Sequence, residues 1–97
     1  MKRTEENIAK ANTLNNAIIA LENKNEQLNK IKDLCNMTNE QKIVYLDVSF
    51  RNDEGNDFKS IRNVQLFTPK DIEALVNAKL KHNNANIESL TIEFEKL

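Results

Sequence analysis

The first third of the chain repeats apolar residues three and four positions apart, which is the period of an amphipathic helix. These positions are Ile8, Ala11, Leu14, Ile18, Leu21, Leu28, Ile31 and Leu34. Thr4, followed by two glutamates, supplies an N-cap residue and acids at the positive end of the helix dipole. No Gly or Pro interrupts the run. The pattern therefore predicts one long helix over residues 4–36.

Leucines recur within this helix at seven-residue intervals. The repeat is typical of a coiled-coil seam, in which one core Asn fixes the register of two chains. The alternative is that Asn, the most frequent residue of the chain, falls on the stripe by chance. The seam predicts an oligomer interface that consists of Leu14, Ile18, Leu21, Asn25 and Leu28.

The seven-residue repeat of leucines resembles a leucine zipper. In the basic-zipper family of DNA-binding proteins, the helix before the zipper is densely basic. The corresponding segment, residues 4–13, has one lysine, Lys10, against Glu5 and Glu6. The resemblance is therefore confined to the heptads and implies no DNA binding.

From Ile43 the apolar period changes to two, which is typical of β-strands. We predict a strand over 43–51, a turn at 52–57 that contains the one Gly, and a second strand over 58–67. Val64 and Leu66 are expected on the same sheet face as Leu46, since a one-residue slip would set polar residues against it.

A second helix is expected to begin at Thr68, because Thr-Pro-Lys-Asp combines an N-cap, a proline at the first helical position and an acid at the third. Asn83-Asn84 is the expected stop, since Asn tolerates positive φ. Alternation over residues 90–95 then predicts a third strand.

The expected fold class is α+β. A single domain, residues 1–97, would hold an oligomerisation helix at 4–36 and a ββαβ unit at 42–97. This unit would form a three-stranded sheet of order 2-1-3 with one covering helix. About thirty helical residues span roughly 45 Å, whereas strands of six to eight residues span roughly 20–27 Å. Either the first helix folds back, or its excess packs against another chain; we expect another chain.

Charge and composition exclude several classes of function. The net charge of the 97 residues is −1, and the parts before and after Lys42 carry about +1 and −2. Neither part has the basic excess that nucleic-acid binding needs. One cysteine permits no internal disulfide and no zinc cluster. No apolar stretch predicts a membrane span or a signal peptide, so we expect a cytoplasmic protein. The bias towards Asn, Lys and Ile indicates AT-rich coding, as in a low-GC bacterium or its phages.

No familiar catalytic or cofactor-binding motif is present, and with one His and one Gly we expect neither an enzyme nor a cofactor. Arg51, Lys59 and Arg62 are the candidate contacts for a partner or a ligand, because they could clamp a phosphate or an acidic surface. The alternative for these cations is pairing with neighbouring acids, such as Asp47 and Asp53. The acids of the turn are expected to be solvated rather than to bind calcium.

The sequence therefore predicts a non-enzymatic homo-oligomer that binds a protein partner, such as a phage accessory protein or inhibitor. The alternative is an oligomer that sequesters a small anionic ligand of the nucleotide type in pockets between subunits. That ligand would meet the same three cations or the amino end of the second helix, at residues 68–71.

Overall fold

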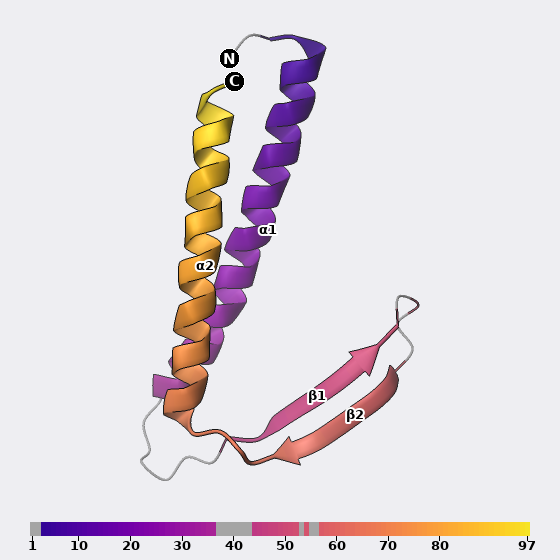
Figure 1. Cartoon of the computed structure of the whole chain (residues 1–97), viewed down its shortest axis with the longest axis vertical. Helices are drawn as coiled ribbons and strands as arrows, with labels where there is room; N and C mark the ends of the chain where they lie inside the picture. The colour runs from indigo at the N-terminus through magenta and orange to yellow at the C-terminus, as the bar shows by residue number, and fades with distance from the viewer. Residues whose placement is uncertain (1–2, 37–43, 53, 55–56) are drawn as a thin grey trace.

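The computed structural model describes residues 3–36, 44–52, 54 and 57–97. The described elements are, in chain order, α1 (Glu5–Asn36), β1 (Leu46–Arg51), β2 (Asp57–Val64) and α2 (Pro69–Glu95). The two helices run antiparallel, side by side, with both chain termini at the same end (Figure 1). The two strands form a hairpin that projects from the opposite end (Figure 1). The fold is thus an antiparallel helix pair that carries a β-hairpin between its two helices.

Each helix begins where the sequence predicts. Thr4 Oγ1 accepts a hydrogen bond from the backbone N–H of Asn7 at 3.1 Å and caps α1. At α2, Thr68 Oγ1 accepts from the Asp71 N–H at 3.2 Å, while Asp71 Oδ2 accepts from the Thr68 N–H at 2.9 Å. These reciprocal bonds form a capping box, with Pro69 at the first helical position. Both predicted helix starts are confirmed.

The expected helix stop at Asn83-Asn84 and the third strand after it are wrong. Helix α2 continues without a break from Pro69 to Glu95. The segment contains no Gly and no further Pro, and the side chain of Asn83 is turned into the contact with α1, where only 8% of the residue is exposed. Helical packing, rather than a left-handed turn, therefore decides the conformation of the two asparagines.

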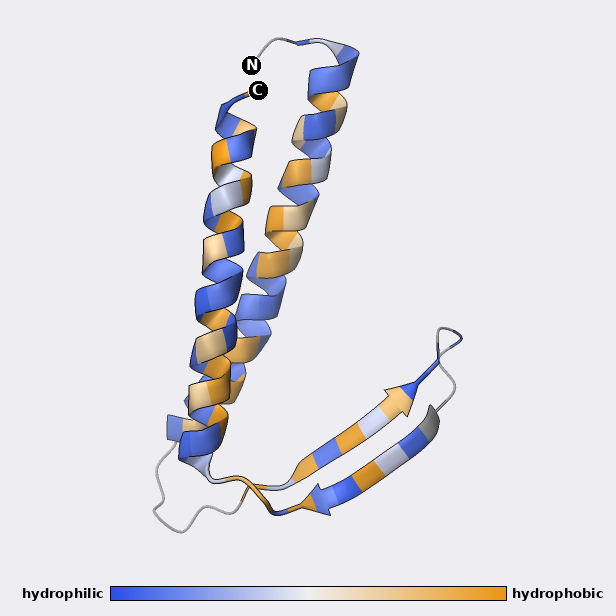
Figure 2. Ribbon diagram, viewed as in Figure 1, coloured by the Kyte–Doolittle hydropathy of each residue, from blue (hydrophilic) through white to orange (hydrophobic). Residues whose placement is uncertain are grey.

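The fold prediction is corrected accordingly. The described residues form a two-stranded sheet of order β1-β2, rather than a three-stranded sheet of order 2-1-3. The second helix covers α1 instead of a sheet, since α1 and α2 pack along each other. Hydrophobic residues line the facing sides of the two helices (Figure 2). Helix α1 is unbroken and does not fold back on itself. Instead α2 packs along it, and packing of α1 against another chain stays a prediction.

The described part of the chain has a small core. Ala11 and Val76 are its only buried apolar residues, and Asn83 is its buried polar residue. The overall extents are 56 × 34 × 15 Å, and the radius of gyration is 18.4 Å. A compact domain of this length has a radius of gyration of about 12–13 Å. The chain is therefore an extended body in which most side chains reach the surface.

The hairpin is irregular on one strand only. Leu46 lies opposite Val64, which agrees with the shared face that was predicted, but Val48 lies opposite Ile61, so β2 uses three residues where β1 uses two. The extra residue is accommodated by Asn63, which has a φ of 58° and donates its backbone N–H to Asp47 Oδ1 at 3.0 Å. Ile61 consequently shares the face of Val48, contrary to the face expected from simple alternation.

Candidate functional site

The predicted seam residues of α1 face α2 of the same chain. Leu14, Ile18, Leu21 and Leu28 are half-buried, and α2 is the element that packs against α1 in the described part of the chain. The seam thus finds its partner helix within the chain, and in the antiparallel rather than the parallel direction. An interface of these residues with a second copy stays a prediction.

Asn25 joins the two helices at the middle of their contact. Its Nδ2 donates to Asn84 Oδ1 at 2.9 Å, and its Oδ1 accepts from Asn83 Nδ2 at 3.0 Å. A carboxamide that bonds a facing carboxamide disfavours any slip of the pair, because a slip leaves the buried Asn83 group unpaired. Asn25 therefore acts as a register residue within the chain.

The hairpin exposes its apolar side chains. Phe50 and Ile61 are 60% and 64% exposed, and Val48 beside them is also exposed. In the described residues neither strand lies against either helix. Only the base of β1, at Leu46, borders the helices, where it lines a hollow with residues of α1 and α2. In the part of the chain that the structure describes, the apolar side chains of the hairpin are therefore without cover from either helix.

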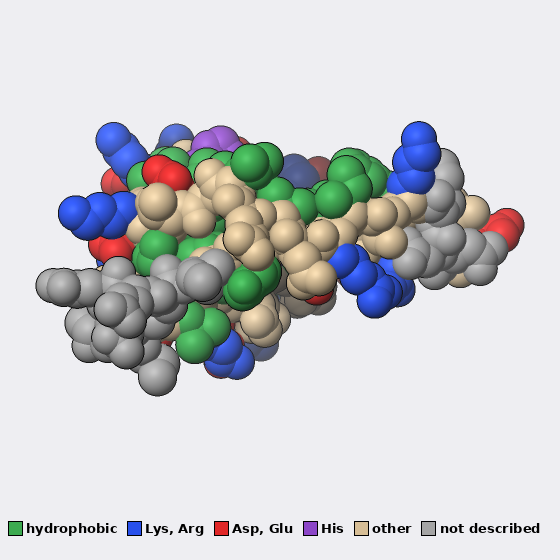
Figure 3. All heavy atoms as spheres, turned by 90° about the horizontal axis from the view of Figure 1, so that it is seen from below, with side chains coloured by type: hydrophobic (Ala, Val, Ile, Leu, Met, Phe, Trp, Pro, Cys, Tyr) green, Lys and Arg blue, Asp and Glu red, His purple; other side chains and the backbone are tan. Residues whose placement is uncertain are grey.

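Further apolar residues extend this surface to the base of the helix pair. A hollow of about 290 Å³ at the base is lined by Ile31, Leu34, Cys35, Val44, Tyr45, Leu46, Pro69 and Ile72. On α2, Leu75 borders a second hollow with Leu66 and Phe67 from the segment that precedes the helix. Leu66 is 80% exposed. Seen from this side, the molecule shows hydrophobic side chains at the surface, with lysine and arginine side chains beside them (Figure 3). We call this region, together with the hairpin, the basal surface.

The three predicted contact cations do not converge. Lys59 lies opposite Phe50 and shares its face, whereas Arg51 alternates with Phe50 and lies on the other face. Arg62 follows Ile61 and so shares the face of Arg51, but it lies about 13 Å further along the hairpin at 3.3 Å per residue. One chain therefore does not form a single clamp from these residues. A role for each cation with a partner stays a prediction.

The amino end of α2 is occupied by the chain itself. Asp71 and Thr68 supply the oxygens that cap it. A bound anion would have to displace a carboxylate that is already bonded there. This geometry gives the ligand-sequestering alternative no support within one chain.

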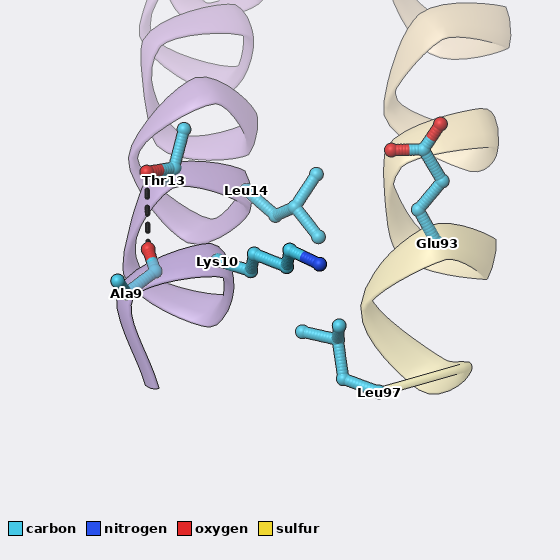
Figure 4. Close-up of a pocket in the computed structure, with 6 residues that line it drawn as sticks. All are labelled: Ala9, Lys10, Thr13, Leu14, Glu93 and Leu97. Carbon is cyan, nitrogen blue, oxygen red and sulfur yellow. Dashed lines mark hydrogen bonds between the residues drawn. The ribbon is translucent and has the colours of Figure 1, made fainter. Parts of the chain in front are cut away.

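The free end of the helix pair has a shallow hollow of about 360 Å³. Lys10 and Leu14 reach into it from α1, and Glu93 and Leu97 approach from α2 (Figure 4). Lys10 is paired with Glu6, with 3.1 Å between Nζ and Oε1, and both side chains are exposed. The hollow is open and holds no set of groups suited to catalysis.

The remaining candidate groups have ordinary surroundings. His82 lies in the middle of α2 rather than near its end, with Asn86 Nδ2 3.3 Å from its Nε2. Cys35 is half-buried in the apolar basal hollow. Among the described residues, no three His, Cys, Asp or Glu side chains are placed to hold a metal ion. Of the turn acids, Asp53 lies outside the described residues.

None of the described helices is long and apolar enough to cross a membrane. Comparisons of the chain with protein-family models, with curated proteins and with solved structures found no match.

The basal surface is the feature that the sequence analysis missed. Its signal was present, because both faces of the predicted hairpin carry apolar residues. The predicted third strand and covering helix would have packed against those residues, so their exposure was not predicted.

Proposed function

We propose that this chain is a non-enzymatic protein-interaction module that works as a homo-oligomer and assembles through its basal surface. The observation that carries the proposal is the exposed apolar hairpin, in which Phe50 and Ile61 have no cover from either helix. An isolated two-stranded hairpin is at best marginally stable in water, so a persistent one needs further strands or another surface against it.

The exposed area supports self-association. The chain exposes 8144 Å², whereas a folded monomer of 11.2 kDa exposes about 5,700 Å². The excess is thus about 2,400 Å² per chain, and a specific interface removes roughly 800 Å² per partner or more. The excess is large enough for a stable oligomer to form from copies of this chain alone.

In this proposal the helix pairs project away from the joined hairpins and remain available to a protein partner. Ile8, Ile92 and Phe94 are exposed near their free ends, beside the hollow at Lys10 and Leu14. Apolar groups around an open hollow suit a protein surface better than a small charged ligand.

The test is the mass in solution, measured by light scattering behind a sizing column, for the wild type, Ile61→Asp and Ile19→Asp. Ile61 is 64% exposed on the hairpin and Ile19 is 46% exposed on α1, so neither substitution buries a charge within one chain. We expect wild type and Ile19→Asp to be oligomers of one mass. We expect Ile61→Asp to form a smaller species than the wild type, because full assembly would bury its carboxylate in an apolar contact.

Two other results would contradict the proposal. A monomeric wild type at all accessible concentrations would remove self-association. If Ile19→Asp dissociates while Ile61→Asp keeps the mass of the wild type, the interface lies on the helices and not on the basal surface. Far-UV circular dichroism of each variant shows whether the helix pair is retained.

A further inference from the structure

The two edges of the hairpin differ, and the difference decides how copies can join. Both extra residues of the ladder lie on β2, one between Ile61 and Val64 and one between Asp57 and Lys59. Bulges interrupt the outward row of N–H and C=O groups and are a common means of blocking edge pairing, as are lysines on the edge. β1 has no extra residue, so its free edge is the regular one.

We propose that two copies pair their β1 strands edge to edge, antiparallel about a two-fold axis at Ser49, to form one four-stranded sheet. This inference rests on the proposed self-association and names the edge contact within it; the apolar face with Phe50 and Ile61 is left for a second contact between copies. The strand order is β2-β1-β1-β2, with the two bulged strands outside. Joining the regular edges leaves exposed only edges that are already irregular.

Charge selects the register. With Ser49 opposite Ser49 of the second copy, Asp47 lies opposite the second Arg51, and the pair occurs twice by symmetry. The same register sets Val48 opposite Phe50 on the other face. Opposite charges and apolar pairs directly across strands each stabilise a sheet.

Neighbouring registers lose these pairs. A shift that sets Val48 opposite itself places Asp47 opposite Ser49 and Arg51 opposite Tyr45. A shift that sets Val48 opposite Ser49 is incompatible with the pleat, because it opposes residues from different faces. The Ser49 register is therefore the one that matches both charge and side-chain alternation.

The existing bond of Asp47 is compatible with the pairing. Asp47 Oδ1 accepts the N–H of Asn63 in its own hairpin, and its Oδ2 takes no part in that bond. The side chain is exposed, as is that of Arg51. The bond to Asn63 orients the Asp47 carboxylate in advance of pairing.

Disulfide trapping tests the register. In a Cys35→Ser background, Ser49→Cys places two thiols opposite each other, with Cα atoms about 4.5–5.5 Å apart. That separation is within the range of disulfides. Ser60→Cys is the matched control, because Ser60 lies opposite Ser49 in the same hairpin but on the outer strand. The Cα atoms of Ser60 in the two copies would be about 14 Å apart, which is three strand spacings.

Under a glutathione buffer we expect Ser49→Cys to form a covalent dimer and Ser60→Cys to stay uncrosslinked. Crosslinking of Ser60→Cys alone would place the interface at β2 and overturn the register. An intact oligomer that crosslinks at neither position would overturn edge pairing but leave the proposed self-association standing. A monomeric Cys35→Ser protein, with wild type also monomeric, would remove both.

Exchange of charges provides an independent readout. Asp47→Arg and Arg51→Asp each set like charges opposite each other, so each alone should weaken the dimer about tenfold. An equimolar mixture of the two variants restores both opposite-charge pairs in a mixed dimer. We expect the mixture to regain the dimer affinity that each variant has lost on its own. No recovery, with both variants helical by circular dichroism, would contradict the register.

Discussion

At the scale of single residues, Asn25 and Asn83 carry much of the specificity of this small molecule. The two carboxamides, with Asn84, form a chain of two hydrogen bonds between the helices, and Asn83 is buried where its amide has little access to water. Apolar packing alone tolerates a shift of one helix along the other, whereas a buried carboxamide pair does not. The net stability of the pair is modest, but breaking it from one side leaves a group without a partner.

This asymmetry gives a prediction for the pair. Asn25→Ala should lower the free energy of unfolding by about 1–3 kcal/mol, because it leaves the Asn83 amide buried without its acceptor. Asn84→Ala should lower it by about 1 kcal/mol or less, since Asn84 is exposed and its partner can bond to water. Urea unfolding at one fixed protein concentration measures both.

The double substitution Asn25→Leu with Asn83→Leu separates the register role from stability. Replacing both partners by apolar groups should return the unfolding free energy close to that of the wild type. Equal losses for Asn25→Ala and Asn84→Ala would show that burial of Asn83 has no energetic consequence.

At the scale of elements, the first turn of each helix fixes where the helix starts, and the bulges of β2 fix the register of the hairpin. The capping box at Thr68 satisfies backbone N–H groups that a helix otherwise leaves open, directly after the exposed Phe67. It therefore fixes the residue at which the connection from β2 ends and α2 begins. On the hairpin, Asn63 plays the corresponding role, since its positive φ admits the extra residue.

The cap supports a matched pair of substitutions. Thr68→Ala should lower the unfolding free energy by about 1 kcal/mol through loss of the bond to the Asp71 N–H. Thr13→Ala removes a hydroxyl that only bonds back to the Ala9 carbonyl within α1. It should be neutral or slightly stabilising, because alanine has the higher helix propensity. Thermal unfolding followed at 222 nm compares the two, and equal effects would contradict the capping role.

At the scale of the whole molecule, a core of so few buried residues leaves little stability for one chain alone. The helix pair and the hairpin share only the base near Leu46, so no single core holds both. Small domains of this kind depend on oligomerisation, disulfides or metals. The chain has one cysteine, and its described residues hold no cluster suited to a metal, so we propose that copies of the chain supply this stability.

The dependence on assembly predicts a concentration-dependent midpoint of thermal unfolding. For a dimer that unfolds to free chains, mass action raises the midpoint by roughly 3 °C for each tenfold increase in concentration. We expect this rise for the wild type and a smaller rise for Ile61→Asp. A wild-type midpoint that does not change over a hundredfold range would contradict coupled folding and assembly.

Local signals of the sequence determined where the elements start. The caps at Thr4 and Thr68 and the alternation around Val48 act through neighbours a few residues away, so they can be read without the fold. The same holds for the shared sheet face of Leu46 and Val64, which alternation predicts. The face on which each candidate cation lies depended on a bulge, which alternation does not reveal.

Only the tertiary structure decided what the middle of α2 does and what covers the heptads of α1. Asn83 and Asn84 suit either a left-handed stop or a helix interior, and their intrinsic preferences differ too little to choose. The choice is made by Asn25, which is 58 residues away from Asn83 in the chain and contacts it only once the helices pack. With α2 continued to Glu95, the apolar stripe of α1 packs inside the chain, and neither helix covers the apolar side chains of the hairpin.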